Sequence, residues 1–179
     1  MAKIEKTITY FEEAGARNTY DVIKAVSERL KEGDINTIVV ASTSGSTGKK
    51  FAKFFRSKVN VVIISYKTMN TSYKKEIISF GGKIAENTRL RFHAGRHPAK
   101  GFYALGQGFK VAIEVMLIAT EKKLLKPYTY IISVGGTCKG ADTAIVVRAT
   151  TLKEIFCRDA TRKLEIREII ALPLVKKWW

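Results

Sequence analysis

Short runs of β-branched residues, separated by segments of helix length, constrain this chain more than any other feature. Such runs fill 37–41, 60–65, 83–86, 130–134, 144–147 and 166–172. They are too short and too rich in valine and isoleucine for helices, so we predict buried strands. Strands that alternate with helices form a mostly parallel sheet covered on both faces, through right-handed crossovers. The sequence therefore predicts an α/β fold.

The segments between these runs predict helices with recognisable ends. Asn18 and Thr19 are expected to cap the first helix, because their side chains can accept the free N–H groups of a first turn. Gly33 is expected to end that helix. Ser72 is expected to cap another helix, which Gly81–Gly82 close.

The longest predicted helix, 109–125, is apolar on almost every side and should therefore be buried or lie at an interface. Pro127 is expected to end it. Its one acid, Glu114, needs a Lys or Arg partner in such surroundings. Residues 4–11 fit either a short strand or an extended arm. The tandem Trp178–Trp179 is expected to dock on the domain or on a partner subunit, and we expect a homo-oligomer.

Charge is the unusual property of the composition. The 179 residues carry 32 Lys and Arg against 16 Asp and Glu, a formal net charge of +16. A field of this sign attracts nucleic acids, nucleotides and phosphorylated metabolites alike, so it indicates an anionic partner without naming it. The length fits one domain, and we expect residues 1–179 to form it.

No segment of the sequence predicts a membrane or secretory role. The longest apolar run, 111–119, is interrupted by Glu114 and is shorter than the ~20 residues that a membrane span needs. The N-terminus lacks the apolar stretch of a signal peptide. Two cysteines, Cys138 and Cys157, cannot build a disulfide framework. We therefore expect a cytoplasmic protein without membrane contact.

The loop 42–48, Ser-Thr-Ser-Gly-Ser-Thr-Gly, has the composition of a phosphate-binding loop. Its glycines let backbone N–H groups turn toward an anion, and its hydroxyls can donate to the anion's oxygens. The helix predicted behind it adds a positive dipole end, and Lys49 and Lys50 add charge. The spacing is not that of an ATP-binding P-loop, because only two residues separate Gly45 from Gly48. A plain strand-to-helix turn is the alternative.

A second glycine-rich turn, 135–140, follows the strand predicted at 130–134. In parallel α/β sheets, ligands bind beyond the carboxyl ends of the strands, near the point where the strand order reverses. Both turns leave from that edge, so we expect them to form one binding site. Cys138 in the second turn is either a reactive thiol or a bystander, and no base lies near it in the sequence.

Five motifs follow one another in the order found in a known family. They are Tyr-Phe-Glu-Glu-x-Gly-x-x-Asn-Thr at 10–19, Val-Val-Ala-Ser-Thr-Ser-Gly-Ser-Thr at 39–47, Gln-Gly-Phe-Lys-Val-x-x-Glu at 107–114, Gly-Gly-Thr-x-x-Gly-Ala-Asp-Thr-Ala at 135–144 and Arg-Glu-Ile-Ile-Ala-Leu-Pro at 167–173. With these motifs the chain resembles the C-terminal domain of pyruvate kinase. It is more closely similar to a family of stand-alone archaeal and bacterial proteins built on that domain alone.

The resemblance implies a three-layer α/β/α fold with a five-stranded, mostly parallel sheet whose last strand is antiparallel and lies at the edge. In pyruvate kinase the matching loop binds a phosphate of a sugar-bisphosphate effector, and the stand-alone relatives resemble binders of flavin mononucleotide (FMN). The residues expected at the phosphate are Ser42, Thr43, Ser44, Gly45, Ser46 and Thr47, and those expected to line the rest of the site are Gly135, Gly136, Thr137, Gly140, Asp142 and Thr143. The kinase active site lies in other domains, so no pyruvate kinase activity is expected and no catalytic residue is assigned. A phosphorylated small molecule, with FMN as the leading candidate, is therefore the expected ligand.

The segment 87–108 is basic and departs from the relatives, which carry a longer stretch with an extra helix. From 87 to 113 there is no Asp or Glu, while cations (Arg89, Arg91, Arg96, Lys100 and Lys110) alternate with aromatics (Phe92, Phe102, Tyr103 and Phe109). Aromatics among cations suit single-stranded nucleic acid, so a nucleic-acid-binding protein acting through 89–110 is the alternative function. A basic surface loop or a subunit contact explains the same pattern. A flavin-dependent oxidoreductase is a further alternative.

His93 and His97 lie four residues apart, a spacing that could present two nitrogens to zinc on a helix. Gly95 and Pro98 argue against a helix there, and no third ligand is evident. We therefore predict no metal site.

Overall fold

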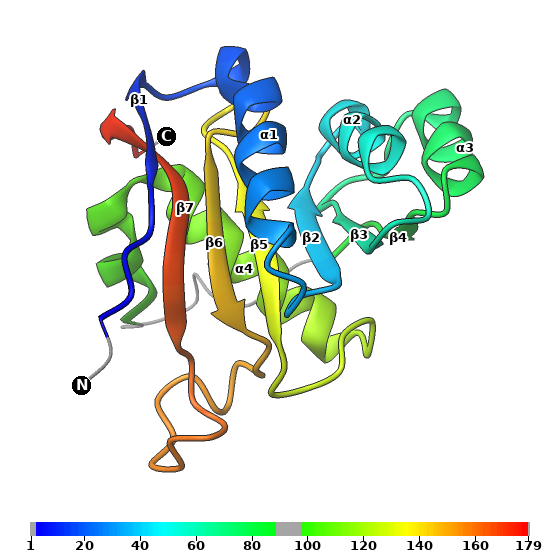
Figure 1. The fold of residues 1–179 in the computed structure, drawn as a ribbon. Coiled ribbons are helices and arrows are strands. Elements are labelled where there is room, and N and C mark those ends of the chain that lie inside the picture. The colour runs from blue at the N-terminus through cyan, green and yellow to red at the C-terminus, as the bar shows by residue number, and fades with distance from the viewer. Residues whose placement is uncertain (1–2, 89–97, 179) are drawn as a thin grey trace.

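The structure is a computed structural model that describes residues 3–88 and 98–178. One mixed sheet runs through the molecule (Figure 1). Within these residues the sheet has seven strands in the order β1-β7-β6-β5-β2-β3-β4. The strands are β1 (Thr9–Glu13), β2 (Thr37–Ala41), β3 (Asn60–Ile64), β4 (Lys83–Ala85), β5 (Tyr130–Gly135), β6 (Thr143–Arg148) and β7 (Ile166–Val175). Each run predicted as a strand forms one, and 9–13 is a strand rather than an arm.

The predicted α/β fold with a mostly parallel sheet is confirmed, and two details of the sheet are corrected. The sheet has seven strands instead of five, and its antiparallel strand lies inside the sheet instead of at its edge. In the described sheet β6 alone runs against its neighbours, between β5 and β7, while β1 pairs parallel with β7. The short turn between β5 and β6 requires this, because strands joined by a tight turn pair antiparallel.

Helices cover both faces of the sheet (Figure 1). The apolar residues of α1 (Thr19–Leu30), α2 (Ser46–Phe54) and α3 (Thr71–Ser79) pack on one face, and those of α4 (Gln107–Glu121) pack on the other. Successive side chains of a strand point to opposite faces. In β2, Val40 accordingly joins the core beneath α1 and α2, while Val39 joins the core beneath α4. The three layers are those expected.

Two helix starts have a different cause from the one predicted. Asn18 is the N-cap of α1, but its side chain makes no capping bond and donates to the carbonyl of Glu13 at 2.7 Å. The cap of α3 is Asn70, whose side chain accepts the N–H of Ser72 at 2.9 Å, so the expected cap at Ser72 is wrong. Asn prevails because its carbonyl oxygen reaches the N–H two residues ahead.

Helix α4 is buried as predicted, yet it ends at Glu121 instead of at Pro127. Lys123 adopts a left-handed φ of 58°, and the N–H of Leu124 donates back to the carbonyl of Ala119 at 2.9 Å, which ends the helix before the proline is reached. Glu114 has the expected cation, since its Oε2 lies 2.6 Å from the buried Nζ of Lys110.

The C-terminal segment docks beside the start of α4. The indole N–H of Trp178 donates to the carbonyl of Tyr103 at 2.8 Å, in the 3-10 helix η3 (Pro98–Leu105), and the N–H of Gln107 donates to the carbonyl of Lys177. Trp178 therefore contacts the domain while half of its surface stays exposed. In the described residues no helix is long and apolar enough to cross a membrane.

Candidate phosphate-binding edge of the sheet

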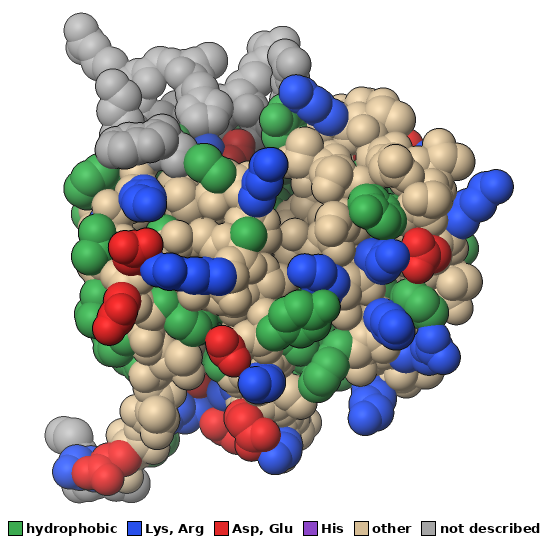
Figure 2. Space-filling model, turned by 90° about the horizontal axis from the view of Figure 1, so that it is seen from above, with side chains coloured by type: hydrophobic (Ala, Val, Ile, Leu, Met, Phe, Trp, Pro, Cys, Tyr) green, Lys and Arg blue, Asp and Glu red, His purple; other side chains and the backbone are tan. Residues whose placement is uncertain are grey.

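The two glycine-rich turns leave neighbouring parallel strands at one edge of the sheet. Strands β2 and β5 pair in parallel with Val40 opposite Val134, so the turns 42–48 and 135–140 begin side by side. The chain passes from β2 to α2 on one face, whereas α4, which leads into β5, covers the other face. This is the point at which the strand order reverses, where ligands of α/β sheets bind. Figure 2 looks down on this edge, where lysine and arginine side chains outnumber acidic ones.

Two hydroxyls of the loop 42–48 accept backbone N–H groups in the first turn of α2. The Ser42 hydroxyl accepts the N–H of Gly48 at 3.0 Å, and the Ser44 hydroxyl accepts the N–H of Ser46 at 3.3 Å. Gly45 precedes the helix with a φ of 93°, a left-handed conformation that favours glycine. These contacts fix the loop as a turn that bends over the start of the helix.

Donors that the loop does not use itself remain available to an anion. Thr43 and Ser44 are exposed, and Ser46 is partly exposed. Among the hydrogen bonds of the described residues, none is donated by the N–H of Thr47. A helix N-terminus with a free N–H and nearby hydroxyls is a favourable place for negative charge.

The two lysines that follow the loop are held at its flanks. Nζ of Lys49 lies 3.1 Å from Oε1 of Glu76 and 4.9 Å from the centre of the Tyr73 ring. Nζ of Lys50 lies 4.8 Å from the ring centre of Tyr20, at the start of α1. Lys49 is thus partly neutralised, while Lys50 keeps its charge beside the loop.

Two residues that the sequence did not single out hold the loop from the segment between β3 and α3. The hydroxyl of Ser65, just after β3, lies 3.0 Å from the carbonyl oxygen of Thr43. The N–H of Asn70 donates to the carbonyl of Ser44 at 3.1 Å. A serine at the end of a Val-Ile run is the only sequence signal that could have indicated the first contact.

The second turn packs too closely against α4 for any side chain at its base. A methyl group at Gly135 would lie 2.0 Å from the carbonyl oxygen of Gly108, and one at Gly108 would lie 2.3 Å from Oδ1 of Asp142. Glycine at both positions therefore lets the helix start reach the end of β5. Gly136 and Gly140 lie in the turn itself, and Cys138 at its tip is exposed.

Asp142 organises this turn from inside the protein. Its side chain is fully buried, and its Oδ2 accepts the backbone N–H of Thr137 at 3.0 Å and that of Gly15 at 2.9 Å. Its Oδ1 accepts the hydroxyl of Thr143 at 2.9 Å. The buried carboxylate thus joins the turn to the segment before α1. A direct contact of Asp142 or Thr143 with a ligand stays a prediction, whereas their part in positioning the edge is visible.

The sequence matches the family model described as pyruvate kinase, alpha/beta domain, over residues 20–147. This chain belongs to that family. The matched region contains β2–β5 and all of β6 except its last residue, and within it β6 is both the antiparallel strand and an edge strand. Strands β7 and β1 lie beyond β6 and come from residues outside the matched region. They extend the sheet of this pyruvate kinase alpha/beta domain to seven strands.

Several predicted residues of the domain lie outside the described part of the chain. They are Arg89, Arg91, Phe92, His93, Arg96 and His97. Among the described residues, no group of three or more His, Cys, Asp or Glu side chains is arranged to hold a metal ion.

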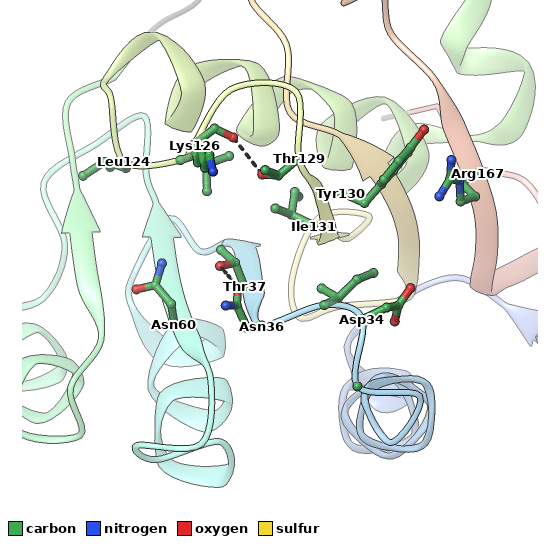
Figure 3. Close-up of a pocket in the computed structure, with 13 residues that line it drawn as sticks. Asp34, Asn36, Thr37, Asn60, Leu124, Lys126, Thr129, Tyr130, Ile131 and Arg167 are labelled. Carbon is green, nitrogen blue, oxygen red and sulfur yellow. Dashed lines mark hydrogen bonds between the residues drawn. The ribbon is translucent and has the colours of Figure 1, made fainter. Parts of the chain in front are cut away.

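A hollow of about 660 Å³ opens at the opposite edge of the domain, at the amino ends of the strands (Figure 3). It is lined by Asn36, Thr37 and Asn60 around the starts of β2 and β3 and by Lys126, Thr129, Tyr130 and Arg167 from the segments around β5 and β7. The guanidinium of Arg167 lies 3.5 Å from the centre of the Tyr130 ring. The hollow shares no residue with the glycine-rich turns, and the amino ends are not the edge at which α/β sheets bind ligands. The carboxyl edge is therefore the candidate site.

Proposed function

We propose that this pyruvate kinase alpha/beta domain binds a phosphate-bearing small molecule on the loop 42–48. The observation that carries the proposal is the position of this loop. It leads through a left-handed Gly45 into helix α2, and it lies beside the second glycine-rich turn at the point where the strand order reverses. Membership of the family supports the same loop, because pyruvate kinase holds a phosphate there.

The phosphate oxygens would accept the N–H of Thr47 and the hydroxyls of Thr43, Ser44 and Ser46. Oxygens of a dianion accept several bonds at once, and charge-assisted hydrogen bonds are about twice as strong as neutral ones. The dipole of α2 adds about 0.3–1 kcal/mol. Lys50 adds positive charge from the flank of the loop.

FMN is the named candidate for the whole ligand, from the resemblance to the stand-alone relatives. Its phosphate would occupy the loop, and its ring would extend toward the turn 135–140. The proposal is one of binding, and no catalytic residue is assigned on this edge. A reaction on the flavin would be a further function.

The proposal is tested by thermal unfolding with FMN, with a sugar bisphosphate and with inorganic phosphate. A ligand at about 100 times its Kd stabilises the fold by about 2.7 kcal/mol, which raises the Tm of a domain of this size by roughly 5–10 °C. An increase with the phosphates but not with FMN would remove the flavin and keep the phosphate. No increase with any of the three would contradict the proposal.

Ser44→Asp and Ser44→Asn form the matched pair of variants. Ser44 is exposed, and both new side chains can still accept the N–H of Ser46, so both variants should fold. Asp places a carboxylate where the phosphate would lie, and Asn has the same shape without the charge. We expect Asp to abolish the increase in Tm and Asn to keep most of it.

A further inference from the structure

The stretch 35–75, which contains the centre of the carboxyl edge, carries positive charge without acidic residues of its own. From 35 to 75 there is no Asp or Glu, whereas eight cations occur there, Lys49, Lys50, Lys53, Arg56, Lys58, Lys67, Lys74 and Lys75. This stretch forms β2, the loop 42–48, α2, β3 and the start of α3, and its Lys58 lies at the amino ends of the strands instead. Figure 2 shows basic side chains spread across the carboxyl edge of the molecule.

Among the described residues, three of the lysines at this edge form no ion pair. Glu76 and Glu86 pair with Lys49 and Lys74. In the ion pairs of the described residues, none involves Lys50, Lys67 or Lys139. Lys139 lies in the turn after β5, and Lys67 lies in the loop after β3. The three charges therefore span the edge on both sides of the loop 42–48.

Two exposed tyrosines accompany these lysines. Tyr20 at the start of α1 is 60% exposed, and Tyr66 just after β3 is 50% exposed. Nζ of Lys50 lies 4.8 Å from the ring centre of Tyr20, and Nζ of Lys67 lies 5.2 Å from that of Tyr66. Each ring offers a stacking surface next to a cation.

We propose that this edge binds single-stranded nucleic acid, with bases stacked on Tyr20 and Tyr66 and phosphates held by Lys50, Lys67 and Lys139. Stacking platforms beside cations are how proteins bind single strands without sequence preference. A duplex keeps its bases stacked inside, so it would gain nothing from the tyrosines. Neighbouring strands lie about 4.8 Å apart, so the edge from β5 to β3 accommodates about two or three nucleotides. This surface is not the segment 89–110, and it does not require a small ligand on 42–48.

The experiment is fluorescence anisotropy with a labelled 12-nucleotide oligo(dT) and with a DNA duplex of the same length. The single strand should bind more tightly than the duplex. Three phosphate contacts predict a slope of log K against log salt of about −2. Tyr20→Ala and Tyr66→Ala should each weaken binding of the single strand by about 5- to 150-fold, because each loses the stacking of one base. Tyr20→Phe and Tyr66→Phe should bind like the wild type.

Two double variants that remove the same charge distinguish binding at this surface from a general effect of the net charge. Lys50→Gln with Lys67→Gln should reduce the slope by about 1.4. Lys122→Gln with Lys153→Gln, two exposed lysines at the amino edge, removes the same charge and should change the slope little. The proposal is overturned if the duplex binds as tightly as the single strand, if the alanine variants bind like the wild type, or if both lysine pairs have equal effects.

Discussion

The carboxylate of Asp142 accepts a hydrogen bond from the backbone N–H of Gly15 at 2.9 Å, across 127 residues of the chain. The same oxygen accepts the N–H of Thr137 in the turn after β5. A buried side chain therefore joins the turn to the segment that leads into α1. A second bond, from the N–H of Ala141 to the hydroxyl of Thr19 at 3.1 Å, acts with it to place the start of α1 beside the turn 135–140.

Asp142→Asn should destabilise the domain by about 2–3 kcal/mol, because a neutral amide replaces a charged acceptor. The amide oxygen of Asn can take the place of Oδ2 and still accept both N–H groups, but it binds them more weakly, and its NH2 group replaces Oδ1, which accepts the hydroxyl of Thr143. Thr143→Val is the matched control, since it removes only the hydroxyl bond to Oδ1 and should cost about 1 kcal/mol. Urea unfolding measures both values, and equal losses would contradict the role assigned to the carboxylate.

Gly108→Ala should destabilise the domain by about 1–3 kcal/mol or more through overpacking. The new methyl group would lie 2.3 Å from Oδ1 of Asp142 and 2.4 Å from the hydroxyl of Thr143. Gly101→Ala in η3 is the control, because nothing lies within 4 Å of that methyl position. Its midpoint of urea unfolding should stay near that of the wild type. A Gly108→Ala variant as stable as Gly101→Ala would mean that α4 does not approach the turn as described.

The stability of the domain should fall in acid because of a network around Arg29. Its guanidinium bonds Asp34 and Glu168. The hydrogen bond from Arg29 lowers the pKa of Asp34. Burial acts to raise the pKa of Glu168, but the hydrogen bonds from Arg29 and Lys6 outweigh it, so that this pKa also is lowered. Carboxyls with a lowered folded-state pKa contribute stability above their ordinary values, 3.8 and 4.5, and lose it as the pH falls through the folded-state pKa.

Arg29→Gln tests this network by urea unfolding between pH 2.5 and 7. The variant should be clearly less stable than the wild type at pH 7. The difference should shrink below about pH 4, where the carboxyls become protonated in the wild type as well. A difference that stays constant over the whole range would show that the carboxylates are not the partners that matter.

Glu76→Gln should strengthen binding of a phosphate ligand about two- to threefold at low salt. The carboxylate of Glu76 lies 3.1 Å from Nζ of Lys49, and its removal leaves that charge free beside the loop 42–48. Because the groups are partly exposed, salt should screen the effect. Titrations at about 20 mM and about 300 mM salt should show the gain in affinity only at the lower concentration. These concentrations lie below and above about 0.1 M, at which the Debye length is about 10 Å. A weaker affinity at low salt would contradict the assignment.

The sequence predicted those parts of the fold that depend on local pattern. The β-branched run 37–41 became β2 with the same bounds, and 60–65 became β3 with one residue fewer. The two turns were expected at one edge, because parallel strands place their carboxyl ends together, and β2 and β5 are neighbours. The Lys110–Glu114 pair followed from the cost of a buried carboxylate.

The remaining features depend on contacts between distant residues, which a pattern along the chain does not record. The Asp142–Gly15 bond is one example, and Arg29–Glu168, which joins α1 to β7 across 139 residues, is another. Strand β1 completes the seven-stranded sheet by pairing with β7, and no local pattern in residues 9–13 indicates β7 as its neighbour. Ser65 supports the loop 42–48 only because β3 lies next to β2.

Backbone amide mapping by NMR during a titration with inorganic phosphate tests the central claim most directly. If the loop 42–48 holds phosphate, the largest shifts should fall on the amides of Gly45, Ser46 and Thr47, and Ser44→Asp should remove them while Ser44→Asn keeps them. Shifts that concentrate instead around Lys126 and Arg167 at the amino edge, or no shifts at all, would contradict the account.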